Sequence, residues 1–361
     1  MKPQAPVSNG PALPPMRTPQ DLERVLEIEF VRATENAALN AIHWLGRGDK
    51  EKGDAAACEA IYGVFDMLDL RGEVVIGEGI KDNAPGIFVG ERLGTWREGS
   101  PRFDIALDPI DGTTNLAKGL PNSISVIAAA QVPEGAPNVM RYLPSFYSYK
   151  IAYGPAMAQA LARDGCPCLL DVPLPEVLRL AARALGKHVR DLVVMTLDRP
   201  RHADVVRAVR EAGAGLRLIS DGDITAAVAP SLPETGIDLY VGAGGSPEAV
   251  LAAAALKCLG GDMQVRMWSH DEAHQAEVAR QVPPEELTRV FRVNDLVVGD
   301  SALFCATGIS DSALLPGIKV IGHRAETHSI QMRARSRTVR RIHAVLHLDH
   351  KAFPLRSRRR A

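Results

Sequence analysis

Apolar residues recur at helical spacing in two segments near the start of the chain. Thr18-Pro19-Gln20-Asp21 combines the hydroxyl, proline and acid that typically begin a helix, and we expect this helix to run to about Gly46. A second helix is expected near Asp54, where five apolar residues would share one face: Ala57, Ile61, Val64, Phe65 and Leu68. Apolar runs then predict strands at residues 74–76, 103–107 and 123–129. These elements favour an α+β lobe, with helices packed on a sheet.

From residue 192 onward, short apolar strands alternate with helices. We expect strands at 192–195, 216–219 and 237–241, and helices from His202, from Ile224 and over 247–259. This alternation implies parallel strands with right-handed crossovers, and therefore an α/β lobe. Ligands in such sheets bind beyond the carboxyl ends of the strands. The active site is therefore expected in the cleft between the two lobes.

Two acidic segments follow predicted strands. Asp108-Pro-Ile-Asp-Gly-Thr-Thr-Asn115 places two carboxylates three residues apart, and Val74-Val-Ile-Gly-Glu-Gly79 places Glu78 at the end of a β-branched run. Mg²⁺ and Mn²⁺ prefer oxygen ligands of this kind. Three carboxylates on two strand ends suffice to hold the two divalent metal ions that two-metal phosphoryl displacement requires. The alternative is an ordinary turn, because Asp, Pro and Gly are the residues that turns select.

These segments and several others resemble a known family. Gly-Glu followed by Asp-Pro-Ile-Asp-Gly-Thr is similar to the lithium-sensitive, metal-dependent sugar phosphatases, which include inositol monophosphatase. The order of further motifs resembles the bacterial class II fructose-1,6-bisphosphatases: Asp54-Ala-Ala-Ala57, Val75-Ile-Gly-Glu-Gly79, Pro85, Tyr153-Gly-Pro155, Arg199-Pro-Arg-His202, Ser220-Asp-Gly-Asp223 and Gly244-Gly-Ser-Pro-Glu248. The likeness covers residues 22 to 342. It implies a layered αβαβα fold with two lobes and an active site between them.

The resemblance implies a role for individual residues. The metal ligands would be Asp54, Glu78, Asp108, Asp111 and Glu248, with the Ile110 carbonyl as a further oxygen. Thr113 would orient and deprotonate the attacking water, and Asp54 would accept the proton through that hydroxyl, with no phosphoenzyme. The substrate contacts would be Lys50, Asp111, Gly112, Thr113, Tyr147, Arg199, Pro200, Arg201, Asp221, Gly222, Asp223 and Gly245. Capping or turn roles compete at Asp54, Thr113, Glu248, Asp221 and Asp223, and a metal role also competes at Asp221 and Asp223.

The activity implied is metal-dependent hydrolysis of the 1-phosphate of fructose-1,6-bisphosphate, in gluconeogenesis or the Calvin cycle. Sedoheptulose-1,7-bisphosphate, as sole or second substrate, stays open. Asp111 departs from the family pattern, where Glu is frequent, and instead matches the inositol phosphatase branch. The shorter side chain moves the carboxylate by ~1.5 Å, which leaves the choice between Mn²⁺ and Mg²⁺ open. An inositol-phosphatase-like enzyme is the corresponding alternative.

The motifs divide the chain into four expected parts. These are a disordered Pro-rich N-terminus (1–17), an α+β metal-binding lobe (18–190), an α/β substrate-binding lobe (191–348) and a basic tail (349–361). The 361 residues, 46% of them hydrophobic, suffice for two lobes with a buried core. Five cysteines without paired spacing are expected to be free thiols.

Charge and hydropathy constrain location and partners. A net charge of -1 argues against bulk attraction to nucleic acid. The start of the chain lacks the apolar core of a signal peptide, and no run approaches the ~20 apolar residues of a membrane span, so we expect a cytoplasmic protein. The expected partner is a small sugar bisphosphate, and the family resemblance implies a homo-oligomer, a dimer or tetramer.

Two binding functions compete with catalysis. The segment Gly242-Ala-Gly-Gly-Ser-Pro247 after a predicted strand resembles a dinucleotide-binding turn, but Pro247 replaces the third glycine. Arginines clustered at 333–341 and 356–360 are the basis for a second alternative, a protein that binds nucleic acid or another anionic partner. Charge runs at chain ends are usually solvated, and aromatic residues are too sparse there to form a stacking surface.

Overall fold

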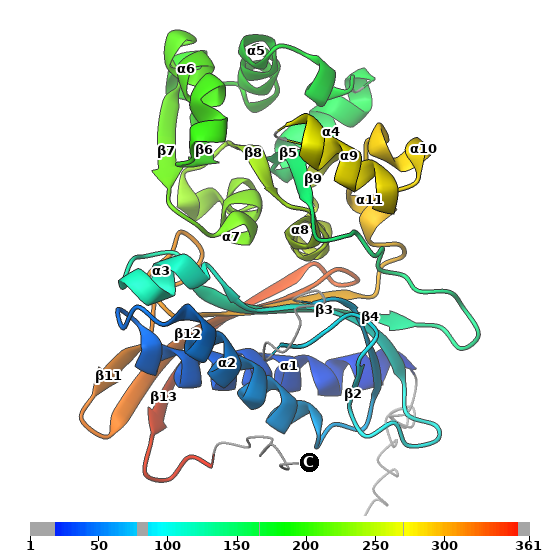
Figure 1. Ribbon diagram of the computed structural model, residues 1–361, viewed down its shortest axis with the longest axis vertical. Coiled ribbons are helices and arrows are strands. Elements are labelled where there is room, and N and C mark those ends of the chain that lie inside the picture. Colours follow the sequence, from blue (N-terminus) through cyan, green and yellow to red (C-terminus); the bar gives the residue numbers. More distant parts are fainter. Residues whose placement is uncertain (1–18, 78–85, 166, 270, 353–361) are drawn as a thin grey trace, which may run out of the picture.

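Two β-sheets of different size organise the structure, a computed structural model that describes residues 19–77, 86–165, 167–269 and 271–352 (Figure 1). Over these residues the larger sheet has eight strands in the order β11-β12-β10-β4-β3-β1-β2, and β13 pairs with β12. The strands are β1 (Arg71–Ile76), β2 (Arg92–Leu93), β3 (Arg102–Asp111), β4 (Ile124–Val132), β10 (Ala302–Gly308), β11 (Lys319–Ile321), β12 (Arg324–Arg333) and β13 (Thr338–His347). Only the β1–β3 pair is parallel among those described.

The smaller sheet has the order β7-β6-β8-β5-β9. Its strands are β5 (Tyr147–Tyr153), β6 (Val193–Leu197), β7 (Gly215–Ile219), β8 (Leu239–Gly245) and β9 (Asp262–Trp268). β6 pairs in parallel with β7 and β8, as the alternation of strands and helices predicted. β5 pairs antiparallel with β8 and β9, so the sheet is mixed.

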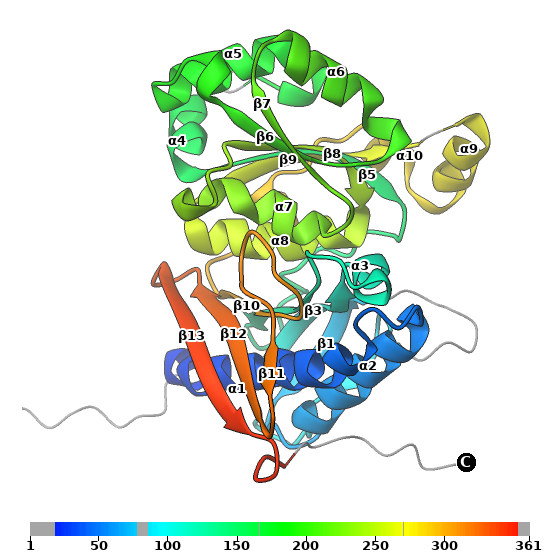
Figure 2. The ribbon, with the colours of Figure 1, turned by 90° about the vertical axis from the view of Figure 1, so that its left-hand side faces the viewer.

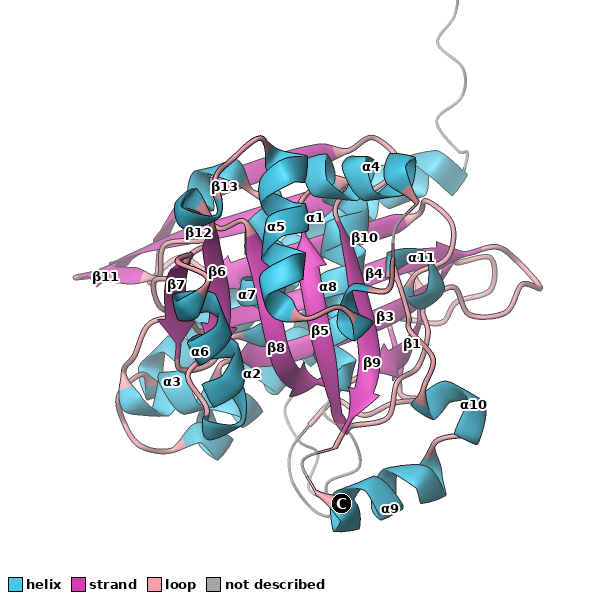
Figure 3. Ribbon diagram, turned by 90° about the horizontal axis from the view of Figure 1, so that it is seen from above, coloured by secondary structure: helices cyan, strands magenta, loops and turns pink. Residues whose placement is uncertain are grey.

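Helices cover both sheets and separate them (Figure 2). Three groups are layered with the sheets: α1 (Pro19–Ala41) and α2 (Lys50–Phe65) under the larger sheet, α7 (Asp223–Val228) and α8 (Ser246–Leu259) between the sheets, and α4 (Pro155–Asp164), α5 (Leu174–Leu185) and α6 (Ala203–Glu211) on the outer face of the smaller sheet. The remaining α-helices are short or peripheral: α3 (Thr113–Lys118), α9 (Glu272–Gln281), α10 (Pro284–Leu287) and α11 (Val293–Leu296). Seen from above, α9 and α10 lie beside the sheets (Figure 3). The mixed α and β class is confirmed.

Helix α8 packs between the two sheets, and most of its length is apolar on all sides. Residues 249–256 are buried throughout, and four consecutive alanines, Ala252 to Ala255, keep this part of the helix narrow. A helix without a polar face is stable only when it is enclosed. α8 contacts β4 and β10 of the larger sheet and β5 and β9 of the smaller one. Its first turn, with Glu248, is thereby held between the sheets.

Several predicted boundaries differ from the structure. The first helix ends at Ala41, and a 3-10 turn, Ile42–Trp44, follows. β3 continues to Asp111, with an irregularity in its pairing to β4 between Asp108 and Asp111. The two sheets also do not follow the division expected at residue 190, because β5 belongs to the smaller sheet and β10 to β13 return to the larger one. Hydrophobic alternation identifies a strand but not its pairing partner.

Candidate active site

A pocket of about 980 Å³ lies between the two sheets and collects most of the predicted site residues. Thirteen of them line it: Lys50, Asp54, Asp108, Asp111, Gly112, Thr113, Tyr147, Arg199, Arg201, Asp221, Asp223, Gly245 and Glu248. Pro200 borders a neighbouring depression, and Gly222 caps α7. Glu78 lies outside the described residues. The pocket therefore contains residues from both sheets.

The end of β3 forms one wall of the pocket. The Ile110 amide donates to Asp108 Oδ1 at 3.0 Å, and the Ile224 amide of α7 donates to Asp111 Oδ2 at 3.2 Å. Gly112 has φ +92°, and a Cβ there would lie 2.3 Å from the Asn122 carbonyl oxygen. Only glycine fits this position without displacing the backbone. The end of β3 thus carries both acids, and the first turn of α7 donates a hydrogen bond to Asp111.

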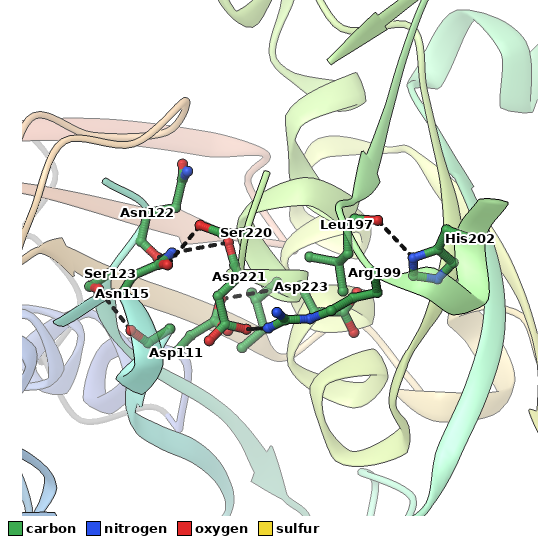
Figure 4. A network of polar contacts seen from close by, with 12 residues as sticks. Asp111, Asn115, Asn122, Ser123, Leu197, Arg199, His202, Ser220, Asp221 and Asp223 are labelled. Atoms are coloured by element: carbon green, nitrogen blue, oxygen red, sulfur yellow. Dashed lines mark hydrogen bonds and ion pairs between the residues drawn. The ribbon is translucent and has the colours of Figure 1, made fainter. Parts of the chain in front are cut away.

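Asn115, the last residue of the acidic motif, links this turn to the smaller sheet (Figure 4). It is fully buried, and its Oδ1 accepts from Ser220 Oγ at 2.8 Å. Its Nδ2 donates to the carbonyls of Asn122 at 3.3 Å and Asp221 at 3.5 Å. Sequence reasoning missed this role, although the position of Asn115 within the motif was a signal.

Asp54 lies inside α2 and does not cap it. The N-cap is Asp49, whose Oδ1 accepts from the Lys52 amide at 3.0 Å. The capping role considered for Asp54 is therefore wrong. The Asp54 side chain is 9% exposed and lines the pocket together with Lys50 from the first turn. Helix α2 thus brings an acid and a base to the end of β3.

The opposite wall carries cations. Arg199 lies 3.8 Å from Asp221, and Arg201 stacks 4.9 Å from the Tyr147 ring centroid. Arg201 Nε also donates to the Ala243 carbonyl at 2.9 Å. Tyr149 instead packs against the apolar cluster between the smaller sheet and helices α4, α5 and α6. Burial there raises its pKa to about 12. Tyr147, and not Tyr149, belongs to the pocket.

His202 supports this wall from behind (Figure 4). It is fully buried, and burial lowers its pKa below the ordinary value. Its Nδ1 contacts the Leu197 carbonyl at 2.8 Å, and the Ala243 amide donates to Nε2 at 2.7 Å. An acceptor at Nε2 requires neutral imidazole with the proton on Nδ1. The neutral ring therefore joins the ends of β6 and β8.

The carboxylates of the pocket need positive charge. Burial, together with Asp108, Asp221, Asp223 and Glu248, raises the pKa of Asp111 well above its usual value. Burial also raises the pKa of Glu248, and its buried Oε2 has no hydrogen-bond partner among the described residues. Concentrated, oxygen-only donors of this kind fit a hard divalent cation. Over the described ranges, which omit Glu78, no three acidic, imidazole or thiol side chains form a complete metal cluster.

Sequence reasoning missed other residues at the pocket. His274 of α9 lines it, with its ring centroid 6.1 Å from Tyr147 and 5.8 Å from Phe146. Lys150 and Tyr240 lie behind the wall and contact Asp223. A lysine within a strand of mainly apolar and aromatic residues was the available signal for Lys150.

Fold and site together define a mixed α and β protein whose pocket combines oxygen ligands with guanidinium groups, as phosphate-ester chemistry requires. Residues 24–346 match the family described as bacterial fructose-1,6-bisphosphatase, glpX-encoded. The chain belongs to this family. The resemblance inferred from the motifs is thereby confirmed, and membership implies a divalent metal requirement.

Two curated relatives match almost their whole length. Fructose-1,6-bisphosphatase class 2 of Haemophilus influenzae is 40% identical over 339 residues, which are 91% of this chain and 98% of the relative. Fructose-1,6-bisphosphatase 1 class 2 of Escherichia coli is 37% identical over 341 residues, 91% of this chain and 97% of the relative. Within the described residues, helices with the length and hydropathy of a membrane span are absent.

Proposed function

We propose that this chain hydrolyses the 1-phosphate of fructose-1,6-bisphosphate to fructose-6-phosphate and phosphate, with Mn²⁺ or Mg²⁺ as cofactor. The observation that carries the proposal is one pocket that joins Asp108, Asp111 and Glu248 to Arg199 and Arg201. The carboxylates suit metal ions, and the guanidinium groups suit a second phosphate. The two relatives named above carry this activity in their names.

The metal-binding role falls to the acids at the end of β3 and around it. Asp54, Glu78, Asp108, Asp111 and Glu248 would hold the ions. When bound, a divalent ion acidifies a water molecule and neutralises phosphate charge. The Thr113 hydroxyl would orient the attacking water and accept its proton, while passing its own proton to the Asp54 carboxylate. Attack would be direct and in line, without a covalent phosphoenzyme.

Most of the proposed substrate contacts lie in the smaller sheet and its connecting segments. Arg199 and Arg201 would bind the phosphate that is not cleaved, because forked guanidinium groups match phosphate geometry. The remaining contacts to the sugar and its phosphates would come from Lys50, Gly112, Tyr147, Pro200, Asp221, Gly222, Asp223 and Gly245. We assign the sugar-phosphatase type of αβαβα layering, a homo-oligomer and a cytoplasmic location as parts of this proposal.

The competing binding functions have weaker support. Arg340 lies 2.9 Å from Glu27, Arg335 lies 3.3 Å from Asp300, and Arg341 pairs with Glu234. These arginines therefore have acidic partners within the chain. Steep salt-dependent retention on nucleic acid would nevertheless contradict our choice.

The test is phosphate release from fructose-1,6-bisphosphate with Mn²⁺, Mg²⁺ or a chelator. Sedoheptulose-1,7-bisphosphate and inositol-1-phosphate are assayed in parallel. Asp108→Ala should lose activity, whereas Asp164→Ala, at an exposed position at the end of α4, should retain it. Metal-dependent release from a ketose bisphosphate supports the proposal and ranks its substrates. Release from inositol-1-phosphate alone, or no release, refutes it.

A further inference from the structure

A fully buried ammonium group lies behind the sugar side of the pocket. Lys150, in β5, is 1% exposed, and its Nζ donates to Asp223 and to the Gly245 carbonyl at 2.6 Å. Lysine is seldom fully buried, and an unpaired buried charge is strongly unfavourable. Asp223 and Gly245 both line the pocket, whereas Lys150 does not, so its hydrogen bonds can affect a ligand through these two residues.

Tyr240 completes the arrangement from the neighbouring strand. Its hydroxyl donates to the other carboxylate oxygen of Asp223, and the ring is fully buried. Lys150 lies opposite Gly242 and Tyr240 lies opposite Ala152 in the β5–β8 ladder, so the two side chains are diagonal neighbours on one face. Both point toward Asp223, the first residue of α7.

The site leaves space for this carboxylate. A Cβ at Gly244 would lie 2.2 Å from Asp223 Oδ2. Glycine at this position therefore lets β8 pass close to the acid. With one oxygen bonded to an ammonium and the other to a phenol, Asp223 has a matched charge and a fixed orientation.

We propose that Lys150 and Tyr240 are positioning residues, which hold the Asp223 carboxylate and the Gly245 carbonyl so that Asp223 binds the sugar and not a metal ion. The inference rests on the proposed function. It assigns Asp223 to the substrate, where a metal role had also been open. Lys150 supplies the positive charge that a metal ion would otherwise supply to this carboxylate.

The primary test compares Tyr240→Phe with Tyr153→Phe in the full chain. Both tyrosines are buried in the same sheet, and Tyr153 donates its hydroxyl to Asp262 at 3.4 Å, outside the pocket lining. We expect Tyr240→Phe to raise KM for fructose-1,6-bisphosphate by about tenfold, because a fixed substrate contact is loosened. The Mn²⁺ concentration for half-maximal activity should change by less than about twofold, since the metal ligands are untouched. Tyr153→Phe should change neither quantity.

A double-mutant cycle tests whether Tyr240 acts through Asp223. If it does, Tyr240→Phe combined with Asp223→Asn should have the KM of Asp223→Asn alone. Lys150→Met should follow the same pattern. Its control is Lys257→Met, which removes an ammonium that donates to the Val297 carbonyl at 2.6 Å at the far end of α8.

Three results would overturn the inference. These are multiplicative effects in the double variant, a raised Mn²⁺ requirement at unchanged KM, or an equal effect of Tyr153→Phe. Turnover by the unaltered chain is measured first and reports on the proposed function alone. If the unaltered chain releases no phosphate, the proposed function and this inference both fail.

Discussion

Asp111 and Asp223 are both buried carboxylates in one pocket, but they belong to different sheets and have different electrostatic surroundings. Asp111 is 5% exposed, and burial together with four surrounding acids raises its pKa. Asp223, at 7% exposure, contacts the ammonium of Lys150 and the hydroxyl of Tyr240. The smaller sheet thus supplies the counter-charge of Asp223, whereas burial and like charges dominate at Asp111, where a bound cation would offset them.

Glu248 lies between these two extremes. Burial and the neighbouring acids raise its pKa, while the charge of Lys150 acts in the opposite direction. Its unpartnered Oε2 places it with Asp111 among the groups that a cation would stabilise. In the proposed function, the boundary between metal-binding and substrate-binding acids would therefore pass between Glu248 and Asp223.

The largest expected effect is the loss of catalysis in Asp111→Asn. We expect phosphate release to fall roughly a thousandfold, because several kcal/mol of transition-state stabilisation depend on the bound cation. The same substitution should raise the unfolding temperature in chelator, because it removes one charge from a crowded set of acids. Thermal unfolding with chelator and steady-state assays with Mn²⁺ check both effects. A lower unfolding temperature in chelator would contradict our comparison.

Asp223→Asn should have the opposite effect on stability. The substitution leaves the buried Lys150 ammonium without a carboxylate, and we expect a loss of about 3 kcal/mol in the free energy of unfolding. Urea unfolding in chelator measures the change. Asp221→Asn is the matched control, because its partner Arg199 is about one third exposed and can be hydrated. Equal losses of unfolding free energy in both variants would show that the buried Lys150–Asp223 pair contributes no more to stability than the partly exposed Arg199–Asp221 pair.

Divalent metal should stabilise the folded chain. At a metal concentration of one hundred times Kd, the expected gain is about 2.7 kcal/mol for one site. Calorimetric unfolding with and without Mn²⁺ tests this. Asp111→Asn should reduce the gain and Asp164→Ala should not. An undiminished gain in Asp111→Asn would place the ion elsewhere.

The smallest effect concerns His202 and pH. The unfolded chain binds the proton at the ordinary histidine pKa, and the folded chain binds it only at lower pH. Stability is therefore full above pH ~6.5 and is lost as pH falls from there toward the folded pKa. The free energy of unfolding of the unaltered chain should change with pH more steeply than that of His202→Gln, by at most about 1.4 kcal/mol per pH unit. Urea unfolding at pH 7.5 and 5.5, with exposed His188→Gln as control, measures it; identical slopes for all three proteins would refute the neutral state of His202.

Sequence reasoning reached the candidate site through local motifs. Asp108 and Asp111 lie three residues apart at the end of one strand, and Glu248 lies in the first turn of a helix, so each carried a signal that can be read over a few residues. Lys150, Tyr240 and Asn115 carried none as strong, because their contacts join segments 73, 17 and 105 residues apart in sequence. The same reason explains why the sheets do not follow the division expected at residue 190: β10 pairs with β4, which lies far earlier in the chain.

By itself, the sequence determined the family, most helices and strands, and the acids and arginines of the site. These features depend on residue types and on spacings of a few residues. Both can be read from the periodicity of apolar residues and from the order of short motifs. Only the tertiary structure decided which sheet each strand joined and which acids obtained a counter-charge. Those outcomes depend on burial and on contacts between distant segments, so the same residue type, aspartate, acquired two different electrostatic environments in one pocket.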